Sequence, residues 1–232
     1  MADKFKDKKI LAIIPARGGS KGLPRKNLKS FAGKPLIAWT IESALKSKHL
    51  DKIIVSTDDQ EIENASKDAG AEVIERPKEL ATDDSLVMDA IRHSLKVLKK
   101  EIKYTPDIVV ILQVTSPLRT TNTIDSAIEI FLKKFDNYDS LISLSQIEGK
   151  IGNIENGLYY PNYVLGQGRQ KVREMYKECG TVYILKTDLI IKGEDFGNNI
   201  HPFIINAREE SIDIDTIDDF QEAEYFFKKS KS

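Results

Sequence analysis

Cysteine is nearly missing from this sequence, since Cys179 is the only one among its 232 residues. An intrachain disulfide needs a second cysteine and a thiolate zinc site needs several, so both are excluded. An excess of charge of one sign is missing as well, because 35 Lys and Arg stand against 36 Asp and Glu, for a net charge of −1. No broad basic field surrounds such a chain, so we expect neither nucleic acid nor a membrane among its partners.

Long hydrophobic runs are also missing. The longest, such as Ile10–Ile14 and Ile108–Leu112, are far shorter than the roughly 20 residues that cross a bilayer. Residues 1–9 contain no apolar stretch, so we expect no secretory signal and place the chain in the cytoplasm. The length fits one domain, and we expect residues 1–232 to fold as one.

What the sequence does contain is an alternation of buried strands and amphipathic helices. Apolar runs typical of strands buried on both faces occur at 10–14, 53–57, 108–112 and, more weakly, 140–144. Apolar residues with helical spacing occur over 36–45, 86–98 and 124–132. This order predicts an α/β fold with a mostly parallel sheet and helices on both faces.

The pattern is interrupted between residues 146 and 178. This segment has five glycines and four tyrosines but no clear period, and a strand resumes at Thr181–Leu185. Its aromatic residues are too frequent for a disordered linker. We therefore expect an insertion that forms either a lid over a substrate or an arm that reaches a partner subunit. A last helix is expected over 216–227, with Thr216 as its N-cap.

The loop after the first strand is a candidate binding site. It spans residues 15–27 and combines three glycines with four cations. Glycine lets backbone N–H groups approach anionic oxygens, and open parallel sheets bind ligands beyond the carboxyl ends of their strands. The spacing fits neither a Walker P-loop nor a dinucleotide fingerprint. A solvated basic turn is the alternative, but the position directly after the first strand favours a polyphosphate site.

Several motifs resemble those of the acylneuraminate cytidylyltransferases, the CMP-sialic acid synthetases. The first is Arg17-Gly18-Gly19-Ser20-Lys21-Gly22 followed by Lys26-Asn27. The others follow in the family's order: Ser56–Asp59, Glu75–Pro77, Leu80–Asp83, Gln113–Arg119 and Asp213–Thr216. The blocks extend over most of the chain outside the insertion, and together they are far more specific than any one alone.

The resemblance implies a Rossmann-like nucleotidyltransferase fold, a homodimer, Mg²⁺ as cofactor, and CTP and a nine-carbon 2-keto sugar acid as substrates. The anomeric hydroxyl of the sugar would attack the α-phosphate of CTP, giving a CMP-sugar and pyrophosphate. The acceptor would be N-acetylneuraminate or a bacterial relative such as legionaminate. Such transfer is mostly positioning and charge stabilisation. The chain must therefore supply phosphate-binding cations, metal-binding carboxylates and contacts to the acceptor.

The same resemblance assigns the nucleotide-binding residues. Arg17 and Lys21, with the loop amides, would hold the β- and γ-phosphates that leave, and both are assigned as catalytic. Gly18 and Ser20 would add an amide and a hydroxyl donor. Three further residues match nucleotide-contacting positions of the family: Lys26, Asn27 and Arg76. For Arg76 the alternative is a salt bridge at the end of a strand, and Arg25, where the family often has lysine, is interpreted as solvated.

Asp213 and Asp215 are the candidate metal ligands. Alternate residues of a strand point the same way, so a short strand here would present both carboxylates on one face. Two such carboxylates suit Mg²⁺ bridging phosphate oxygens. Asp215 is also assigned as catalytic, because it could assist deprotonation of the anomeric hydroxyl. An exposed strand face with two acids is the alternative.

Fewer residues are assigned to the acceptor. Gln113, at the end of the third buried strand, resembles the family's contact to the sugar acid. Arg169 and Gln170, in the insertion, are further candidates for substrate binding.

Some residues keep two interpretations. Arg119 either pairs with a carboxylate or braces the turn before it. Asp58 and Asp59 either bind ribose or cap the helix that starts near Gln60. At Cys179-Gly180-Thr181 the family usually has Asn-Gly and a small residue, so the acceptor preference stays open.

Two alternatives to this function stay open. The first is the same reaction with another acidic sugar, pseudaminate or 3-deoxy-manno-octulosonate. Enzymes for the latter usually carry Ser-Thr-Arg after the loop arginine, and the run Gly19–Gly22 argues against them. The second is a non-catalytic nucleotide-sensing domain, which the loss of Lys21 or of both acids would have favoured.

Overall fold

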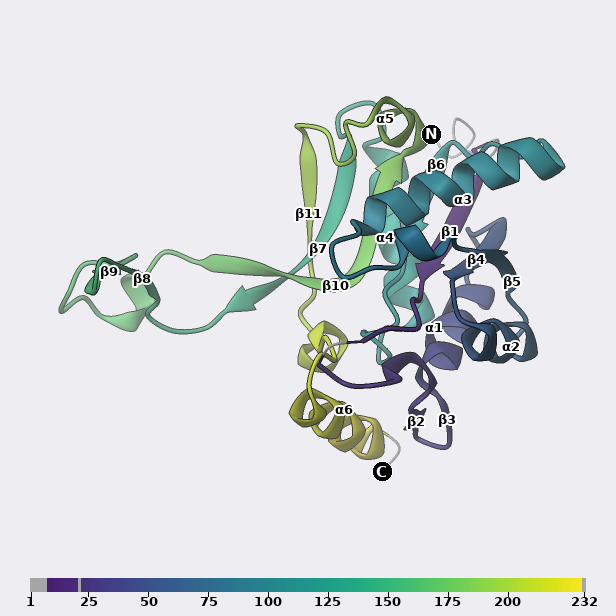
Figure 1. Cartoon of the computed structure of the whole chain (residues 1–232). Coiled ribbons are helices and arrows are strands. Elements are labelled where there is room, and N and C mark those ends of the chain that lie inside the picture. Colours follow the sequence, from purple (N-terminus) through teal and green to yellow (C-terminus); the bar gives the residue numbers. More distant parts are fainter. Residues whose placement is uncertain (1–7, 21, 231–232) are drawn as a thin grey trace.

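A sheet of seven strands lies at the centre of the structure, a computed structural model that describes residues 8–20 and 22–230 (Figure 1). From one edge to the other, its strands are β11 (Ile200–Ile204), β7 (Ser140–Ile147), β10 (Met175–Lys186), β6 (Ile108–Ile111), β1 (Ile10–Pro15), β4 (Lys52–Thr57) and β5 (Glu72–Glu75). Within the described residues, β10 alone runs antiparallel to its neighbours in this sheet. The prediction of a mostly parallel sheet is confirmed.

Strand β1 lies inside the parallel part of the sheet. Its Ile13 is opposite Ile54 of β4 and Ile111 of β6. Ala12 belongs to the core on one face of the sheet, and Ile13 belongs to the core on the other. Because both faces of the strand are covered, its sequence is apolar throughout rather than alternating.

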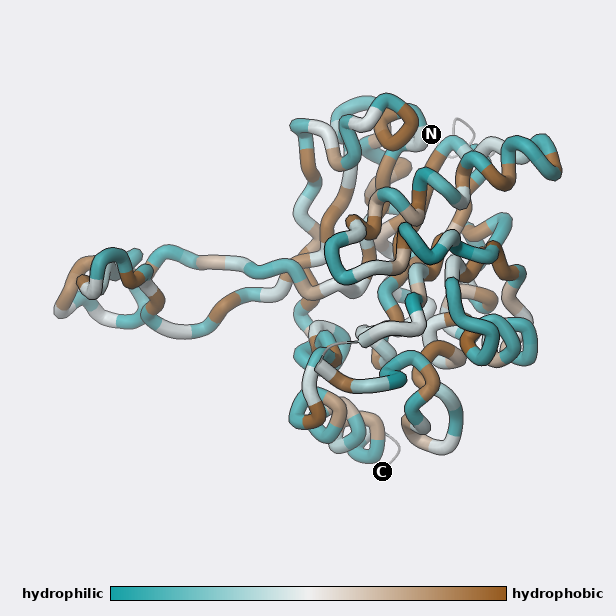
Figure 2. The backbone as a smooth tube through the Cα atoms, in the orientation of Figure 1, coloured by the Kyte–Doolittle hydropathy of each residue, from teal (hydrophilic) through white to brown (hydrophobic). Residues whose placement is uncertain are grey.

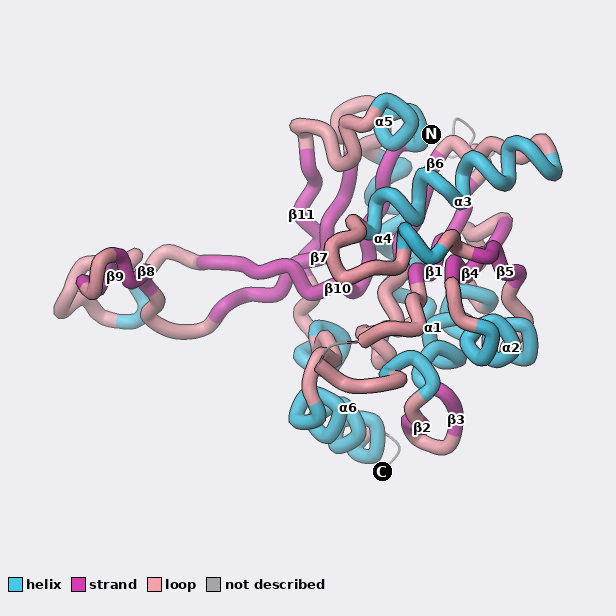
Figure 3. Tube along the Cα trace, viewed as in Figure 1, coloured by secondary structure: helices cyan, strands magenta, loops and turns pink. Residues whose placement is uncertain are grey.

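Helices cover both faces of the sheet, as predicted (Figure 3). One core includes residues of α1 (Leu36–Leu45), α2 (Gln60–Asp68), α4 (Thr121–Lys133) and α6 (Ile217–Lys229). The other includes residues of α3 (Val87–Ile102) and α5 (Thr187–Lys192). The helices expected from the sequence are confirmed, and Thr216 caps α6. No helix of the described ranges is long and apolar enough to cross a bilayer.

Residues 146–178 form an arm that projects from the body of the protein (Figure 1). Its stem continues β7 and β10, with Met175 opposite Ile147. Its outer part holds the hairpin of β8 (Gly152–Glu155) and β9 (Leu158–Pro161). Hydrophobic residues occur along it (Figure 2), and several are exposed, including Ile154 at 77%. The arm points away from the body, so it does not form a lid over its own chain.

Four aromatic rings hold α6 to the body. Phe31, in the short pair of β2 (Ser30–Phe31) and β3 (Lys34–Pro35), is fully buried. Its ring is edge-on to those of Trp39 and Phe220, with centroids 6.0 and 5.5 Å apart. Trp39 in turn contacts Phe227 at 4.7 Å. Since α6 follows the two candidate metal ligands directly, this cluster also anchors their segment.

We expect Phe220→Ala to lower the free energy of unfolding by about 3–5 kcal/mol, because it removes a buried ring and leaves a cavity. Tyr225→Ala, in the same helix, should change it by less than about 0.5 kcal/mol, because Tyr225 is 60% exposed. Urea unfolding followed by circular dichroism measures both variants. An equal loss of unfolding free energy in Phe220→Ala and Tyr225→Ala would contradict the anchoring role of the aromatic cluster.

Candidate active site

A cavity of about 360 Å³ opens at the carboxyl ends of β1 and β6. This is the edge of an open parallel sheet at which ligands bind. Its lining comes from the glycine-rich loop, from residues 76–87 after β5, from residues 113–115 after β6, and from Asp215. Of the residues assigned from the sequence, it brings together Arg17, Ser20, Lys26, Asn27, Arg76, Gln113 and Asp215.

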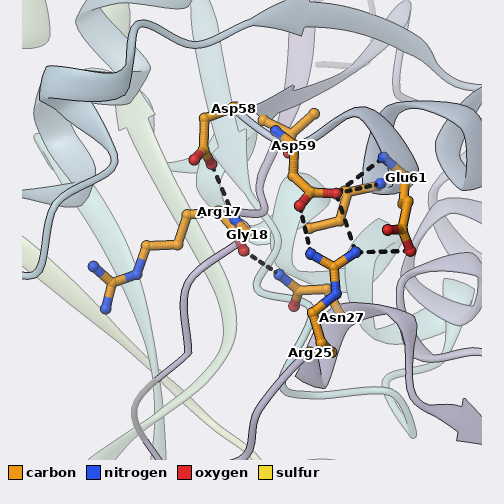
Figure 4. A network of polar contacts seen from close by, with 9 residues as sticks. Arg17, Gly18, Arg25, Asn27, Asp58, Asp59 and Glu61 are labelled. Carbon is orange, nitrogen blue, oxygen red and sulfur yellow. Dashed lines mark hydrogen bonds and ion pairs between the residues drawn. The ribbon is translucent and has the colours of Figure 1, made fainter.

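The glycine-rich loop makes two contacts that only glycine permits. A Cβ on Gly18 would lie 2.8 Å from Asp59 Oδ2, and a Cβ on Gly22 would lie 2.3 Å from the carbonyl oxygen of Asp215. A side chain at either position would push the loop away from its neighbours. The amide of Gly18 donates to Asp58 Oδ1 at 2.9 Å (Figure 4). Gly18 thus fixes the loop by its backbone and does not line the cavity.

Arg17 is anchored to the segment after β5. Its guanidinium donates to the carbonyl oxygen of Thr82 at 2.6 Å and pairs with Asp83 at 2.9 Å. Its own carbonyl oxygen accepts from Asn27 Nδ2 at 2.9 Å. These contacts hold a cation and an amide side chain at the cavity, where a phosphate oxygen needs donors.

Arg76 is buried at the base of the cavity, with only 5% of its surface exposed. It donates to the hydroxyl of Ser56 at 3.2 Å and to the carbonyl oxygen of Ser56 at 2.7 Å. Burial lowers the pKa of Arg76 to about 10, so the guanidinium stays charged at neutral pH. A buried cation that borders a cavity favours an anionic ligand there.

Lys26 joins the loop to the C-terminal part of the chain. Its Nζ donates to Asp215 Oδ1 at 2.9 Å and to the carbonyl oxygen of Ile214 at 2.5 Å. Asp219 accepts from the amide of Asp215 at 3.1 Å, and it also closes the capping box of α6 with Thr216. The backbone that carries Asp215 is therefore fixed from both sides.

The expectation of a short strand at Asp213 and Asp215 is wrong. Residues 212–215 form no strand, because no neighbouring strand pairs with them, and the amide of Ile214 donates instead to the carbonyl oxygen of Thr115 at 2.8 Å. Ile214 is buried in the core, while Asp215 borders the cavity. Asp213 is half-buried and does not line it.

The Asp213 carboxylate is nevertheless suited to a cation. Its Oδ1 is buried and has no hydrogen-bond partner among the described residues. Burial raises the pKa of the Asp213 carboxyl; a hydrogen bond with Thr115 opposes this in part, and the nearby charge of Asp215 adds to it. In the described ranges no group of three or more His, Cys, Asp or Glu gathers to hold a metal. The two carboxylates would therefore need phosphate oxygens or water to complete an octahedral Mg²⁺ site.

Gln113 lines the cavity and is held in place by its neighbours. Its Oε1 accepts from the hydroxyl of Thr115 at 3.3 Å. A Cβ on Gly180 would lie 3.0 Å from the same oxygen, and Gly180 has a φ of +69°, which favours glycine. The Cys179-Gly180-Thr181 departure noted in the sequence therefore lies directly against the proposed acceptor contact.

Arg119 braces the turn, which decides between its two interpretations. It is 3% exposed and donates to the carbonyl oxygens of Thr181 at 2.6 Å and Gln113 at 3.1 Å, and to the hydroxyl of Thr40 at 3.0 Å. Burial lowers its pKa to about 9. Arg119 thus ties β10 to the backbone of Gln113.

Asp59 and Arg25 form an ion pair. Asp59 accepts from the amides of Glu61 and Ile62 at 3.0 Å each, so its capping role is confirmed. Arg25 is exposed, as expected, but it is also ion-paired, because it donates to Asp59 at 2.5 Å and pairs with Glu61 at 2.9 Å. Its positive φ of 55° turns the loop so that its side chain reaches the first turn of α2.

Arg169 and Gln170, both assigned to substrate binding, do not line the cavity. Arg169 and Gln170 lie in a short 3-10 helix on the arm, where Arg169 pairs with Glu148 at 2.9 Å and both side chains face solvent. Their role in substrate binding stays a prediction. Lys21 lies outside the described residues.

Residues 82–87 form part of the cavity wall that the sequence analysis did not assign. Ser85 lies in this segment, and Leu86 and Val87 present exposed apolar side chains at the start of α3. Such exposed apolar residues beside polar donors suit a flat ring as ligand. In the sequence, the one indication of this part of the cavity wall was the block Leu80–Asp83, which overlaps it.

Comparisons with known proteins fit this geometry. A family model described as cytidylyltransferase matches residues 11–230. The chain is 38% identical over 217 residues to CMP-N,N'-diacetyllegionaminic acid synthase of Legionella pneumophila, covering 90% of this chain and 91% of the relative. It is 34% identical over 220 residues to N-acylneuraminate cytidylyltransferase of Streptococcus agalactiae, covering 91% of this chain. It spans about half, 52%, of that relative's length.

A solved structure shares the fold. It is a CMP:2-keto-3-deoxy-manno-octonic acid synthetase in complex with CTP, with a TM-score of 0.71 and 20% sequence identity. The likeness covers 96% of this chain and 99% of the other. At that identity it shows the fold alone, and it confirms the Rossmann-like α/β architecture expected from the sequence.

Proposed function

The chain belongs to the cytidylyltransferase family, and on that premise we propose that it joins CTP to a nine-carbon 2-keto sugar acid. The products would be a CMP-sugar and pyrophosphate. One observation carries the proposal: a single cavity has Arg17, Lys26 and Arg76 in its lining together with the carboxylate of Asp215. Cations for a polyphosphate and a carboxylate for a metal or a proton thus meet at the carboxyl ends of the strands.

The reaction would form a bond between the anomeric oxygen and the α-phosphorus and break the bond to the β-phosphate. Negative charge grows on the leaving pyrophosphate, and Arg17 with the loop amides would stabilise it. Lys21 is proposed to share this role. Asp215 would accept the proton of the anomeric hydroxyl, and this is supported by its place in the cavity lining and its largely exposed side chain.

The nucleoside would lie against residues 76–87. Arg76 supplies a buried charge there, and Leu86 and Val87 supply an apolar surface for a ring. Lys26 and Asn27 would contact ribose or phosphate from the loop. The amide of Gln113 would then face the sugar acid.

Mg²⁺ is the proposed cofactor, and Asp213 and Asp215 are the residues that would hold it. The unpartnered buried oxygen of Asp213 and the hard carboxylate donors fit such an ion. When bound, it would neutralise charge on phosphate oxygens. In this structure Lys26 supplies the positive charge beside Asp215.

We further propose that the chain acts as a homodimer in the cytoplasm, and that the arm meets the partner subunit. Exposed apolar residues on the arm support this: Ile154, Leu158, Tyr160, Val164 and Leu165. In such a dimer, Arg169 and Gln170 would contribute to the partner's acceptor site.

The reaction is tested by pyrophosphate release from CTP and Mg²⁺ with a panel of acceptors. The panel contains N-acetylneuraminate, legionaminate, pseudaminate and 3-deoxy-manno-octulosonate, and a sample without acceptor is the control. We expect release with one nine-carbon acid and none with the eight-carbon sugar. If no acceptor gave pyrophosphate release while CTP still bound, the nucleotide-sensing alternative would be favoured.

We expect Asp215→Asn to lower turnover at least about a hundredfold, because it removes a metal-binding charge at the reacting phosphate. CTP binding, measured by calorimetry, should largely survive. Asp218→Asn, which changes an exposed acid in the first turn of α6, is the matched control and should stay active. Full activity of the unaltered protein with EDTA present would contradict the metal assignment.

The dimer is tested by sedimentation of the full chain at micromolar concentration. We expect a species of twice the 26.2 kDa chain mass. Leu158→Asp on the arm should shift it toward the monomer, because a charge enters an apolar contact. Ile102→Asp, at an exposed residue of α3, should leave it unchanged. A single 26.2 kDa species for the unaltered chain would contradict the dimer.

A further inference from the structure

Asp59, between β4 and α2, contacts both ends of the glycine-rich loop (Figure 4). Its Oδ1 accepts from the amides of Glu61 and Ile62. Its Oδ2 accepts from Arg25 Nη1 at 2.5 Å, and Arg25 Nη2 pairs with Glu61 at 2.9 Å. At the other end of the loop, Gly18 lies so close to the Asp59 side chain that a Cβ would clash with it.

The neighbouring carboxylate completes this arrangement. Asp58 Oδ1 accepts from the amide of Gly18 at 2.9 Å. We name Gly18, Arg25, Asp58 and Asp59 the loop clamp. The clamp holds the ends of residues 18–25, the stretch that contains Gly19, Ser20 and Gly22 of the cavity lining.

We propose that Asp59 and Arg25 are positioning residues, whose ion pair fixes residues 18–20 and 22–25 in the shape that receives the triphosphate. Neither side chain lines the cavity, so both act through the loop. The inference rests on the proposed function for its ligand, and it adds two residues to which that function assigned no part in binding.

The backbone of Arg25 shows why the loop needs such a contact. Arg25 has φ 55° and ψ 27°, a left-handed conformation that a residue with a Cβ adopts only at a cost in free energy. Surrounding contacts must therefore hold it. The fork of the guanidinium does so by reaching two carboxylates, Asp59 and Glu61, at once.

Within the clamp, Arg25 offsets the charge of one of the two carboxylates, that of Asp59. An unpaired carboxylate at Asp59 would repel a triphosphate bound to the loop. Arg25 neutralises it, and its hydrogen bond lowers the pKa of the Asp59 carboxyl below the ordinary value. A carboxyl whose pKa is lowered is charged at every pH above its ordinary pKa. It loses its charge, and with it the ion pair, only as the pH falls through the lowered pKa. The clamp is therefore intact at neutral pH.

The test compares Asp59→Asn, Arg25→Ala, the double variant and Arg25→Lys with the unaltered chain. Asparagine is as good an N-cap as aspartate, so Asp59→Asn keeps the start of α2 and removes only the ion pair. Glu63→Gln is the matched control, because it breaks the exposed Glu63–Lys67 pair of the same helix without touching the loop. Each variant is measured by hydrogen exchange of the backbone amides of residues 16–27, by calorimetry with CTP, and by KM and kcat for CTP.

We expect Asp59→Asn and Arg25→Ala each to speed exchange in the loop but not in α2. We expect each to weaken CTP binding about fivefold, the size that an exposed ion pair reaches, with a larger change in KM than in kcat. The double variant should be no weaker than either single variant, and Arg25→Lys should recover part of the loss. Glu63→Gln should match the unaltered chain.

Three outcomes would overturn the proposal. Loop exchange and CTP affinity could stay unchanged in both single variants. The losses could multiply in the double variant, which would show that the residues act separately. Asp59→Asn could bind CTP more tightly while Arg25→Ala binds it less tightly, which would make Arg25 a phosphate ligand. If the unaltered chain released no pyrophosphate with any acceptor, the proposed function would fail, while loop exchange would still decide on the clamp.

Discussion

The cavity depends on the contact between the loop after β1 and the segment before α6. Gly22 lies so close to the carbonyl oxygen of Asp215 that no side chain fits between them, and Lys26 donates to both Ile214 and Asp215. Lys26 and Asp215 are 189 positions apart in the chain. Such a contact forms only after long-range closure of the sheet and docking of α6. It brings cations from the N-terminal part of the chain to a carboxylate near its C-terminal helix, which no local motif could do.

Two buried arginines at this edge of the sheet serve different purposes. Arg119 has oxygen acceptors from three residues and Glu210 nearby, so its two terminal nitrogens are paired within the protein, while its Nε has no partner in the described residues. The Arg76 guanidinium donates only to Ser56 in the described residues, with the carboxylate of Asp58 nearby, and it borders the cavity. Burying a cation costs free energy unless oxygens or an anion compensate it. Under the proposed function, an anionic ligand would further compensate the charge of Arg76, whereas Arg119 braces the scaffold.

The sequence predicted two kinds of feature: patterns that repeat along a whole helix or strand, and motifs made of adjacent residues. Apolar runs and helical spacing predicted the sheet and its covering helices, because burial on both faces leaves a pattern in every element. The cavity loop was predicted from a motif of adjacent residues. The strand at Asp213 was predicted wrongly, because Ile212 and Ile214 alternate as a strand does although no neighbour pairs with them. The partner of Arg25 could not be predicted, because it lies 34 positions away and depends on a positive φ.

The division between body and arm has a consequence for the acceptor. Every described residue that lines the cavity belongs to the body of the protein. Arg169 and Gln170 instead lie on an arm that points away from that cavity (Figure 1). For them and Gln113 to contact one sugar, the arm must come from a second chain, as in the proposed dimer. Because the arm joins the body only through the extensions of β7 and β10, its residues can change without disturbing the loop or Asp215. Under the proposed function, such a fold would let the acceptor contacts change while the cavity stays the same.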